Sequence, residues 1–380
     1  NILIIGCSIA GPALATCLLL SDLPADQQPH ITVLERSPGL RTEGQNIDIR
    51  GAGITIIRRL GIEKQIKART TGEEGVRLVD MQNRIWAQFS ADKSGKMSTP
   101  TADVEILRGT LAEILYQRAR TGIEFIWGDH LDSIEQDGDK VDVHFAKSGQ
   151  RRRFDLVVGA DGLQSTTRGM VWGQHADRVV KKLAGGVYGA FFSMAAGQND
   201  TMWRRWFHAP GRRGVMVRPD EQRDRVTVFM TLINDTDERL SVVATNRREE
   251  VQAQKQLMKE FFQDAGWECD RIVDGMMKTK DFYYDMIAQV KMDNWSKGRV
   301  ALLGDAGYCA SPFSGMGTTL GLTGAWNLAG AILQHPNDHG RAFAQYEEKM
   351  RPTVELAHKL APGMPNALHP QTSWGVWILN

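Results

Sequence analysis

The stretch Val300-Ala301-Leu302-Leu303-Gly304-Asp305-Ala306 joins a short apolar run to an acidic residue beside a glycine. The sequence soon continues as Pro312-Phe313-Ser314-Gly315-Met316-Gly317-Thr318-Thr319 and enters a segment rich in small residues, 320–329, which is typical of a closely packed helix. A buried strand followed by a carboxylate, bare backbone N–H groups and a helix N-terminus suits the binding of a polar ligand. The stretch therefore predicts one side of a nucleotide site, whose other side must come from distant parts of the chain.

The N-terminus has the pattern of a strand, a phosphate-binding turn and a helix. Residues 2–5 are continuously apolar, as in a parallel strand that is buried on both faces. Gly6-Cys7-Ser8-Ile9-Ala10-Gly11 follows at once, and an apolar, alanine-rich helix is expected over 12–20. Small residues let such a turn tighten, so that a pyrophosphate can lie on the helix N-terminus. Ser8 replaces the second glycine of the G-x-G-x-x-G pattern, but it is small and its hydroxyl can donate to a phosphate oxygen.

Two later segments extend this pattern. A second strand is expected over 31–34 and ends on Glu35-Arg36, where an acid can accept hydrogen bonds from ribose hydroxyls. A further buried strand is expected in the stretch that begins at Asp155, and it ends in Asp161-Gly162. The first segment completes a βαβ unit of the length found in dinucleotide-binding folds, and the second predicts that the nucleotide-binding domain resumes after an insertion.

The sequence alone leaves the roles of two arginines and one acidic residue open. The polar loop 41–51 contains Arg41 and Asp48, and it is equally compatible with a solvated connection and with a ligand contact. Arg108 stands in front of a helix expected over 110–116. There it is either an ordinary surface arginine or one that reaches into a cleft.

The order of these segments predicts an α/β fold with two further parts. Segments of strand length between 182 and 281, separated by turn residues, indicate an antiparallel sheet, and helices are expected over 339–350 and 352–360. The expected boundaries are 1–70, 101–175 and 286–335 for the nucleotide-binding domain, 71–100 for a hairpin of the substrate domain, 176–285 for the substrate-binding β-sheet and 336–380 for the C-terminal helices.

Composition narrows the class of protein. An apolar content of 42% and a charged content of 24% are ordinary for a globular protein, and a net charge of +1 gives no reason to expect nucleic acid or a membrane surface as a partner. No apolar run is long enough to span a membrane, and the first residues have the pattern of a strand and not of a signal peptide. The four cysteines have no paired spacing, so we expect free thiols and a cytoplasmic protein.

No hydrolytic or metal-binding motif accompanies these elements. The sequence lacks G-x-S-x-G, H-E-x-x-H and a GK[ST] phosphate loop, and His335 and His339 bracket a turn that favours a loop over a metal site. We therefore assign no catalytic side chain and no metal, and we expect a bound cofactor to supply the chemistry.

In order and spacing, three elements together resemble the class A flavoprotein monooxygenases: Gly6-x-Ser8-x-x-Gly11 with Glu35-Arg36, then 155–168 with its Asp161-Gly162, then Gly304-Asp305-Ala306 with Pro312 and Gly315-x-Gly317. The resemblance covers nearly the whole chain and is greatest toward tetracycline-inactivating and polyketide-hydroxylating members. It implies a Rossmann-like FAD-binding domain, an antiparallel β-sheet substrate domain and a C-terminal helical segment.

The resemblance also implies roles for individual residues. Glu35 would hold the adenosine ribose, Arg36 would lie over the adenine, Arg108 would meet the ribityl–pyrophosphate region and Asp305 would bind the ribityl hydroxyls. Gly315, Met316 and Gly317 would face the pyrimidine edge of the flavin, Asp48 would lie beside it, and Arg41 and Asp161 would take part in NADPH binding. The expected cofactor-binding set is completed by Gly6, Ser8, Ile9, Ala10, Gly11, Gly304, Pro312 and Thr318. Tyr308 stands where the family commonly has a histidine, which puts any role of that histidine in doubt here.

The reaction implied by the resemblance is oxygen transfer to an organic substrate. NADPH or NADH would dock transiently and reduce FAD, in agreement with the lack of a second dinucleotide fingerprint. O2 would then give a flavin C4a-hydroperoxide that oxygenates a polycyclic aromatic or polyketide substrate, with tetracycline-like compounds and antibiotic resistance among the expectations. The candidate substrate contacts are Tyr188, Phe192, Trp206, His208, Met216 and Phe313.

Several alternatives stay open. A flavin-dependent halogenase shares the fold, although Trp203-Arg204-Arg205-Trp206 does not match the W-x-W-x-I-P stretch usual in that class. An oxidase or reductase without oxygen transfer and a non-enzymatic flavin-binding protein are the other two. The apolar tail 374–379 would either cap the substrate domain or pair with a second chain, so a monomer and a homodimer are both compatible with the sequence.

Overall fold

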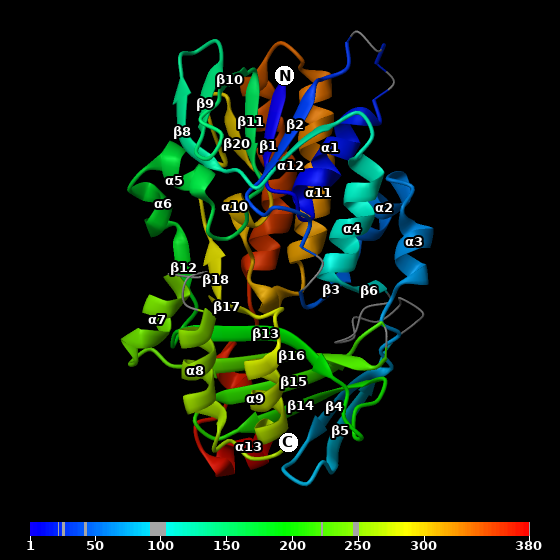
Figure 1. Ribbon diagram of the computed structural model, residues 1–380, viewed down its shortest axis with the longest axis vertical. Helices are drawn as coiled ribbons and strands as arrows, with labels where there is room; N and C mark the ends of the chain where they lie inside the picture. The colour runs from blue at the N-terminus through cyan, green and yellow to red at the C-terminus, as the bar shows by residue number, and fades with distance from the viewer. Residues whose placement is uncertain are drawn as a thin grey trace.

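The computed structural model describes residues 1–21, 23–24, 27–41, 44–91, 104–221, 223–245 and 251–379, and shows two lobes, one above the other in Figure 1. The upper lobe is built on a six-stranded sheet with the order β19-β20-β11-β1-β2-β7, and the lower lobe is built on a seven-stranded sheet with the order β17-β13-β16-β15-β14-β4-β5. The chain crosses between the lobes several times, so neither lobe is one continuous stretch of sequence. This confirms the α/β class and the two-sheet architecture expected from the sequence.

The upper sheet is parallel except at one edge. Its strands are β1 (Ile2–Ile5), β2 (Ile31–Glu35), β7 (Glu124–Trp127), β11 (Leu156–Gly159), β20 (Val300–Leu302) and β19 (Ser296–Lys297). β1 lies between β2 and β11, and β20 pairs with the other side of β11. Strands from the beginning, the middle and the end of the chain are therefore neighbours, and their carboxyl ends meet along one edge.

Helices and small sheets surround the upper sheet. The helices are α1 (Ala10–Leu19), α2 (Ala52–Arg59), α3 (Glu63–Ala68), α4 (Arg108–Ala119), α5 (Thr166–Trp172), α6 (His175–Arg178), α10 (Asp305–Tyr308), α11 (Gly317–Gln334) and α12 (His339–His358). The small sheets pair β3 (Asn46–Ile49) with β6 (Val104–Leu107), β12 (Val180–Lys182) with β18 (Ala288–Val290), and β8 (Leu131–Gln136) with β9 (Val141–Phe145) and β10 (Arg151–Phe154). The two helices expected over 339–350 and 352–360 are one helix, α12, with Pro352 inside it, which corrects that prediction.

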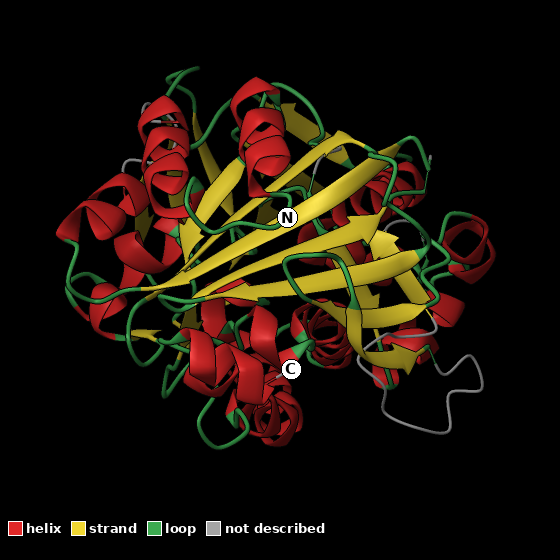
Figure 2. Cartoon of the chain, turned by 90° about the horizontal axis from the view of Figure 1, so that it is seen from below, coloured by secondary structure: helices red, strands yellow, loops and turns green. Residues whose placement is uncertain are grey.

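The lower sheet is made mainly of antiparallel strands. They are β4 (Gly75–Val79), β5 (Ile85–Ser90), β13 (Val187–Ala195), β14 (Trp203–Ala209), β15 (Arg213–Pro219), β16 (Arg225–Ile233) and β17 (Tyr283–Met286). In the view from below, the long strands lie between helices on either side (Figure 2). One face packs on α7 (Glu238–Thr245), α8 (Val251–Phe262) and α9 (Cys269–Lys278) through a separate apolar core, and η1 (Pro312–Ser314), η2 (Asn366–Leu368) and α13 (Ser373–Leu379) complete the described elements.

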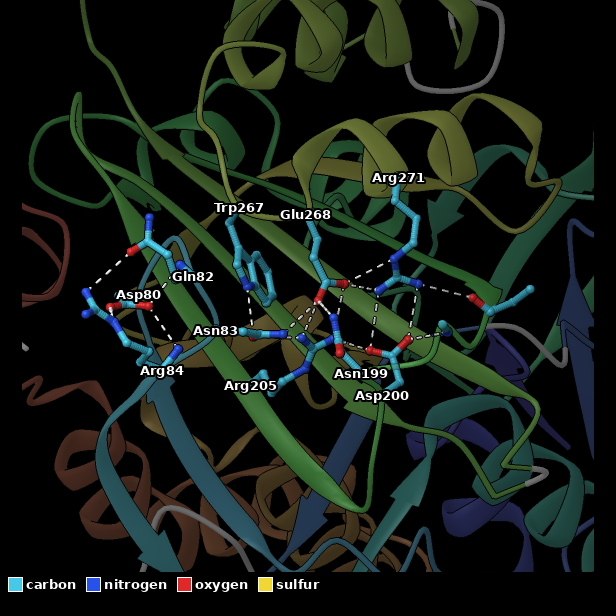
Figure 3. A network of polar contacts seen from close by, with 12 residues as sticks. Asp80, Gln82, Asn83, Arg84, Asn199, Asp200, Arg205, Trp267, Glu268 and Arg271 are labelled. Atoms are coloured by element: carbon cyan, nitrogen blue, oxygen red, sulfur yellow. Dashed lines mark hydrogen bonds and ion pairs between the residues drawn. The ribbon is translucent and has the colours of Figure 1, made fainter.

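A buried polar network holds α9 on the lower sheet (Figure 3). Arg205 of β14 forms ion pairs with Asp200 and Glu268, and Arg271 of α9 pairs with the same two carboxylates. The two arginines lower the pKa of Glu268 to about 2, against the opposing effect of burial. Two carboxylates and two guanidinium groups thus share one site and keep each other charged inside the protein.

Candidate cofactor and substrate site

The first turn after β1 is tight because two glycines leave no room for a side chain. Gly6 has φ of 108°, and a Cβ there would lie 2.5 Å from the carbonyl oxygen of Ala160. A Cβ on Gly11 would lie 2.0 Å from the carbonyl oxygen of Gly6. The turn therefore packs against the end of β11 and presents the N-terminus of α1, with Ser8, Ile9 and Ala10 half-buried at the opening.

Glu35 lies at the end of β2, beside this turn. One carboxylate oxygen accepts a hydrogen bond from the backbone N–H of Cys7 at 2.9 Å, and the other accepts from the N–H of Ser37 at 2.9 Å. The carboxylate is therefore fixed next to the glycine turn, where a ribose would lie in a dinucleotide fold. Arg36, the next residue, is exposed.

Asp161 has its carboxylate occupied by its own turn. It accepts hydrogen bonds from the Ser165 hydroxyl at 2.6 Å, the Thr167 hydroxyl at 3.0 Å and the Thr167 N–H at 3.0 Å. Arg168, which we did not include in the expected site, is buried and donates to the carbonyl oxygens of Leu163 and Ala306, each at 2.8 Å. Asp161 and Arg168 thus fix the turn after β11 against the helix that begins at Asp305.

The loop from Gly304 to Thr319 lies against the start of α1. Gly304 has φ of 66°, and a Cβ there would lie 3.4 Å from the Cβ of Ala10 and 3.8 Å from the Cα of Gly321. Gly315 also has positive φ, at 62°, and open space lies where its Cβ would be. Bare backbone thus lies between the first turns of α1 and α11, and the region bounded by the Gly6–Gly11 turn, Glu35, Arg108 and the 304–319 loop is called the cofactor groove below.

Asp305 points into this groove. Its side chain is exposed, and loss of hydration from the neighbouring protein raises the pKa of the carboxyl against the lowering effects of Cys309 and Arg108. A Cβ on Gly317 would lie 3.9 Å from the Asp305 carboxylate, so the acid and the glycine-rich loop face each other. Pro312, Met316 and Thr318 lie in the same loop.

Two guanidinium groups face the other side of the groove. Burial and the nearby positive charge of Arg41 lower the pKa of Arg108, whereas Tyr283, Asp305 and Glu35 oppose this effect. In the described part of the chain, neither arginine forms an ion pair with a carboxylate. Two neighbouring cations that form no direct ion pair with a described carboxylate are suited to a pyrophosphate.

Asp48 is a half-buried residue of β3. Its Oδ2 accepts from the Arg50 Nη2 at 2.8 Å, while its Oδ1 is buried and has no hydrogen-bond partner among the described residues. The backbone of Arg50 donates to and accepts from the Thr319 hydroxyl, at 3.1 Å in both cases. Arg50 and Thr319 were not part of the expected site, because nothing in their local sequence shows that β3 meets the first turn of α11.

Tyr308 lies in the core and not in the groove. Its hydroxyl shares a 2.8 Å hydrogen bond with the Tyr346 hydroxyl, and its ring centroid is 4.6 Å from that of Trp295. Burial raises the pKa of Tyr308 to about 12. Tyr308 is therefore a neutral packing residue.

The face of the lower sheet that looks toward the cofactor groove carries a continuous cross-strand row. The paired residues are, in order across the sheet, Tyr283, Phe191, Phe229, Met216, Trp206 and Leu78. Directly paired residues present their side chains on the same face. The rings of Phe191 and Phe229 stack with centroids 4.1 Å apart, and Phe313 of the glycine-rich loop packs in the same small apolar cluster as Phe229.

The residues of this row differ in part from the expected substrate contacts. Trp206 and Met216 belong to it, and Phe313 lies against it, but Tyr188 and Phe192 point to the opposite face. There they pack in the core beneath α7–α9, so their inclusion among the substrate contacts was wrong. The aromatic residues on the groove face, Phe191, Phe229 and Tyr283, were not in the expected set.

His208 lies beside the row and is buried. Its ring centroid is 4.8 Å from that of Trp206 and 6.0 Å from that of His369, which comes from the C-terminal segment. Neither ring nitrogen has a hydrogen-bond partner among the described residues, and burial, with His369 adding, lowers the pKa of His208 to about 3. His208 is thus neutral and covered, and it lies on the same face of β14 as Trp206, two residues further along the strand.

A separate cavity of about 1020 Å³ is lined by residues of both lobes. Gly44, Leu107 and Thr110 form one wall, and residues of α9 form another. It contains none of the glycine-turn or acidic residues of the cofactor groove, so it lies beside that groove and does not replace it. Among the described residues, no cluster of metal-ligating side chains and no helix able to cross a membrane is found.

Comparison with known proteins identifies relatives along the whole chain. The FAD binding domain family matches residues 1–361. The chain is 33% identical over 396 residues to the FAD-dependent monooxygenase asL6 of Sarocladium schorii, covering 100% of this chain and 90% of that protein. It is 36% identical over 378 residues to a flavin-dependent monooxygenase of an unknown prokaryotic organism, covering 100% and 89%. The crystal structure of tetracycline destructase Tet(51) superposes with a TM-score of 0.80 at 34% identity, covering 94% of this chain and 88% of that one.

Proposed function

This chain belongs to the FAD-binding domain family of flavin-dependent monooxygenases, and from that membership we propose that it uses NADPH or NADH and O2 to oxygenate a flat polycyclic aromatic or polyketide substrate. The observation that carries the substrate class is the row of aromatic and sulfur-containing side chains facing the cofactor groove. Such side chains bind flat rings over a large area at small conformational cost.

The groove residues fit FAD. The N-terminus of α1 with Arg108 would hold the pyrophosphate, Glu35 the adenosine ribose, Asp305 the ribityl chain, and the backbone around Gly315 the flavin edge. Among the described residues, Arg41 and Arg108 form no ion pair and the Asp48 Oδ1 has no hydrogen-bond partner, and these features together with the open space at Gly315 support this assignment. When bound, FAD supplies the redox chemistry and the activation of O2.

The chain's own residues would orient the substrate and exclude water. Phe313 of the glycine-rich loop and Phe229 of the row pack against the same small apolar cluster, so a substrate ring on the row would lie beside that loop. The apolar cluster around these two residues, Leu183, Val187, Ile233 and Ile287, keeps water from that side. Arg41 is exposed at the groove and suits a reductant that docks and leaves.

The test is product analysis with the FAD-loaded protein. NADPH and NADH oxidation and O2 uptake are measured with tetracycline, an anthraquinone and a naphthol as candidate substrates. The masses of the products are determined by mass spectrometry. A product heavier by one oxygen atom supports the proposal. A change of two hydrogens without oxygen would instead identify an oxidase or reductase, and no turnover above free FAD would contradict an enzymatic role.

A further inference from the structure

The two ends of the cross-strand row differ in their access to solvent. At one end of the row, Leu78 is half-buried, and His208, two residues after Trp206 on the same strand, is 2% exposed and lies beside His369 of the C-terminal segment. At the other end, Tyr283 is 42% exposed, although Phe191, next to it in the row, is only 7% exposed. The open end of the row is therefore the Tyr283 end, and a ligand longer than the central pair of rings extends in that direction.

Tyr283 is exposed but its ring is fixed. Its hydroxyl donates to the Asp285 Oδ2 at 2.6 Å, and Asp285 is buried. The second carboxylate oxygen of Asp285 accepts from the Met286 N–H at 2.9 Å and from the Gln164 amide at 3.5 Å. Gln164 belongs to the turn after β11 in the upper lobe, so the Tyr283 ring is held in place relative to the cofactor groove as well as to the sheet.

The position of the glycine-rich loop marks where the reacting part of a substrate lies. Phe313 packs in the cluster of Phe229, which is two strands away from Tyr283 in the sheet order. Two strand spacings are roughly 10 Å. Between them the ring centroids are 4.1 Å apart for Phe229 and Phe191 and 6.2 Å apart for Phe191 and Tyr283. A ligand confined to the ring above Phe229 does not reach Tyr283, whereas an elongated fused-ring ligand does.

We propose that Tyr283 is a specificity-determining residue that receives the distal ring of an elongated fused-ring substrate whose reacting ring lies over Phe229. The proposal rests on the proposed function, because it names one end of the same substrate site. A fixed, exposed ring gains stacking energy without losing conformational freedom on binding. It therefore increases the affinity for long substrates and leaves the affinity for short ones unchanged. The bond to Asp285 gives the ring its orientation, and the ring itself gives the affinity.

The inference is tested by binding rather than by turnover. Quenching of tryptophan fluorescence is titrated with 1-naphthol, with alizarin and with tetracycline, which have two, three and four fused rings, for the parent and for Tyr283→Ala and Tyr283→Phe. We expect Tyr283→Ala to raise the Kd for tetracycline about 10-fold and that for alizarin less, with 1-naphthol within about 2-fold of the parent. Tyr283→Phe keeps the ring but loses the bond to Asp285, so its effect should be smaller and should follow the same order.

The matched control is Phe89→Ala, which removes another exposed aromatic side chain from the other edge of the same sheet. It should leave all three affinities unchanged. Equal shifts for the three ligands in Tyr283→Ala, or no shift for tetracycline, would overturn the proposal, as would a parent that binds none of them. Absence of oxygenated product from a parent that still binds in this order would contradict the proposed function alone.

Discussion

Asp48 and Glu105 lie directly opposite each other on the antiparallel strands β3 and β6, so two carboxylates share one side of the ladder inside the protein. Glu105 also lies near Glu73, and burial together with these two acids raises the pKa of Glu105. Such a concentration of negative charge is stable only with nearby cations. The lower sheet provides them as Arg204 and Arg218.

Four of these side chains form a buried cluster of ion pairs between the lobes, called the square below: Glu73, Glu105, Arg204 and Arg218. Arg204 pairs with Glu73 at 2.7 Å and with Glu105 at 3.5 Å, and Arg218 pairs with Glu73 at 3.1 Å and also with Glu105. Arg204 and Arg218 are on the face of the row, next-but-one to Trp206 and Met216. The square therefore fixes the substrate face relative to Asp48 and the cofactor groove.

Removing one member of the square should be costly. Arg218→Met leaves the two buried carboxylates Glu73 and Glu105 with Arg204 as their one remaining partner in the square, and we expect the free energy of unfolding to fall by about 3–5 kcal/mol. The double variant Glu105→Gln with Arg218→Met removes both charges and should recover most of this loss. Urea denaturation of the three proteins measures it, and equal losses in the single and double variants would show that charge pairing is not the cause.

The glycine turn should not accept a methyl group. Gly11→Ala places a Cβ 2.0 Å from the carbonyl oxygen of Gly6, so the turn must open and FAD binding should be lost. Gly330→Ala is the matched control, because this helical glycine has nothing within 4 Å of its Cβ position and should gain about 0.5–1 kcal/mol of stability. FAD fluorescence titration and thermal unfolding report the two effects, and a Gly11→Ala protein that binds FAD normally would contradict the assigned turn.

Asp305 should matter for the cofactor more than for the fold. Because its carboxylate points into the groove, Asp305→Ala should abolish tight FAD binding while the unfolding temperature without FAD stays close to that of the parent. Asp305→Asn keeps hydrogen-bonding capacity and should weaken binding less. A yellow, fully loaded Asp305→Ala protein after dialysis would rule out the ribityl assignment.

The network around Glu268 should make stability depend on pH in acid. The folded pKa of Glu268, about 2, lies below the value near 4.3 of an unfolded glutamate. Its contribution is therefore full above about pH 4.3 and is lost as the pH falls toward 2. The stability difference between the parent and Glu268→Gln should accordingly be largest at neutral pH and shrink in that window. A difference that is constant from pH 7 to pH 3 would contradict the ion-pair role.

The candidate cofactor groove could be proposed from the sequence because each of its parts is local. Gly6, Glu35, Asp161 and Asp305 each stand at or just after the end of a strand, and parallel strands bring their carboxyl ends to one edge. The family resemblance then added the order of the parts. The sequence could not predict a role that depends on a long-range contact, such as that of Thr319 against Arg50.

The substrate face was predictable only in part. Neighbouring residues of a strand point to opposite faces, so a choice between Phe191 and Phe192 requires the register of β13 against β16 and the knowledge of which face meets the cofactor lobe. Both residues are aromatic, and the run 187–195 is almost entirely buried, so no alternation of polar and apolar residues marks the faces. The C-terminal segment that covers His208 likewise has no local signal for its partner.

The place of β20 in the upper sheet has a consequence for biosynthesis. This strand is residues 300–302 of 380, yet it pairs with β11, which in turn pairs with the first strand of the protein. While the ribosome is still making the lower lobe, β11 is an unprotected sheet edge, and such edges recruit other chains. A nascent or truncated chain that ends before residue 300 should therefore need chaperone protection, and stop codons upstream of β20 should yield aggregates rather than a smaller folded protein.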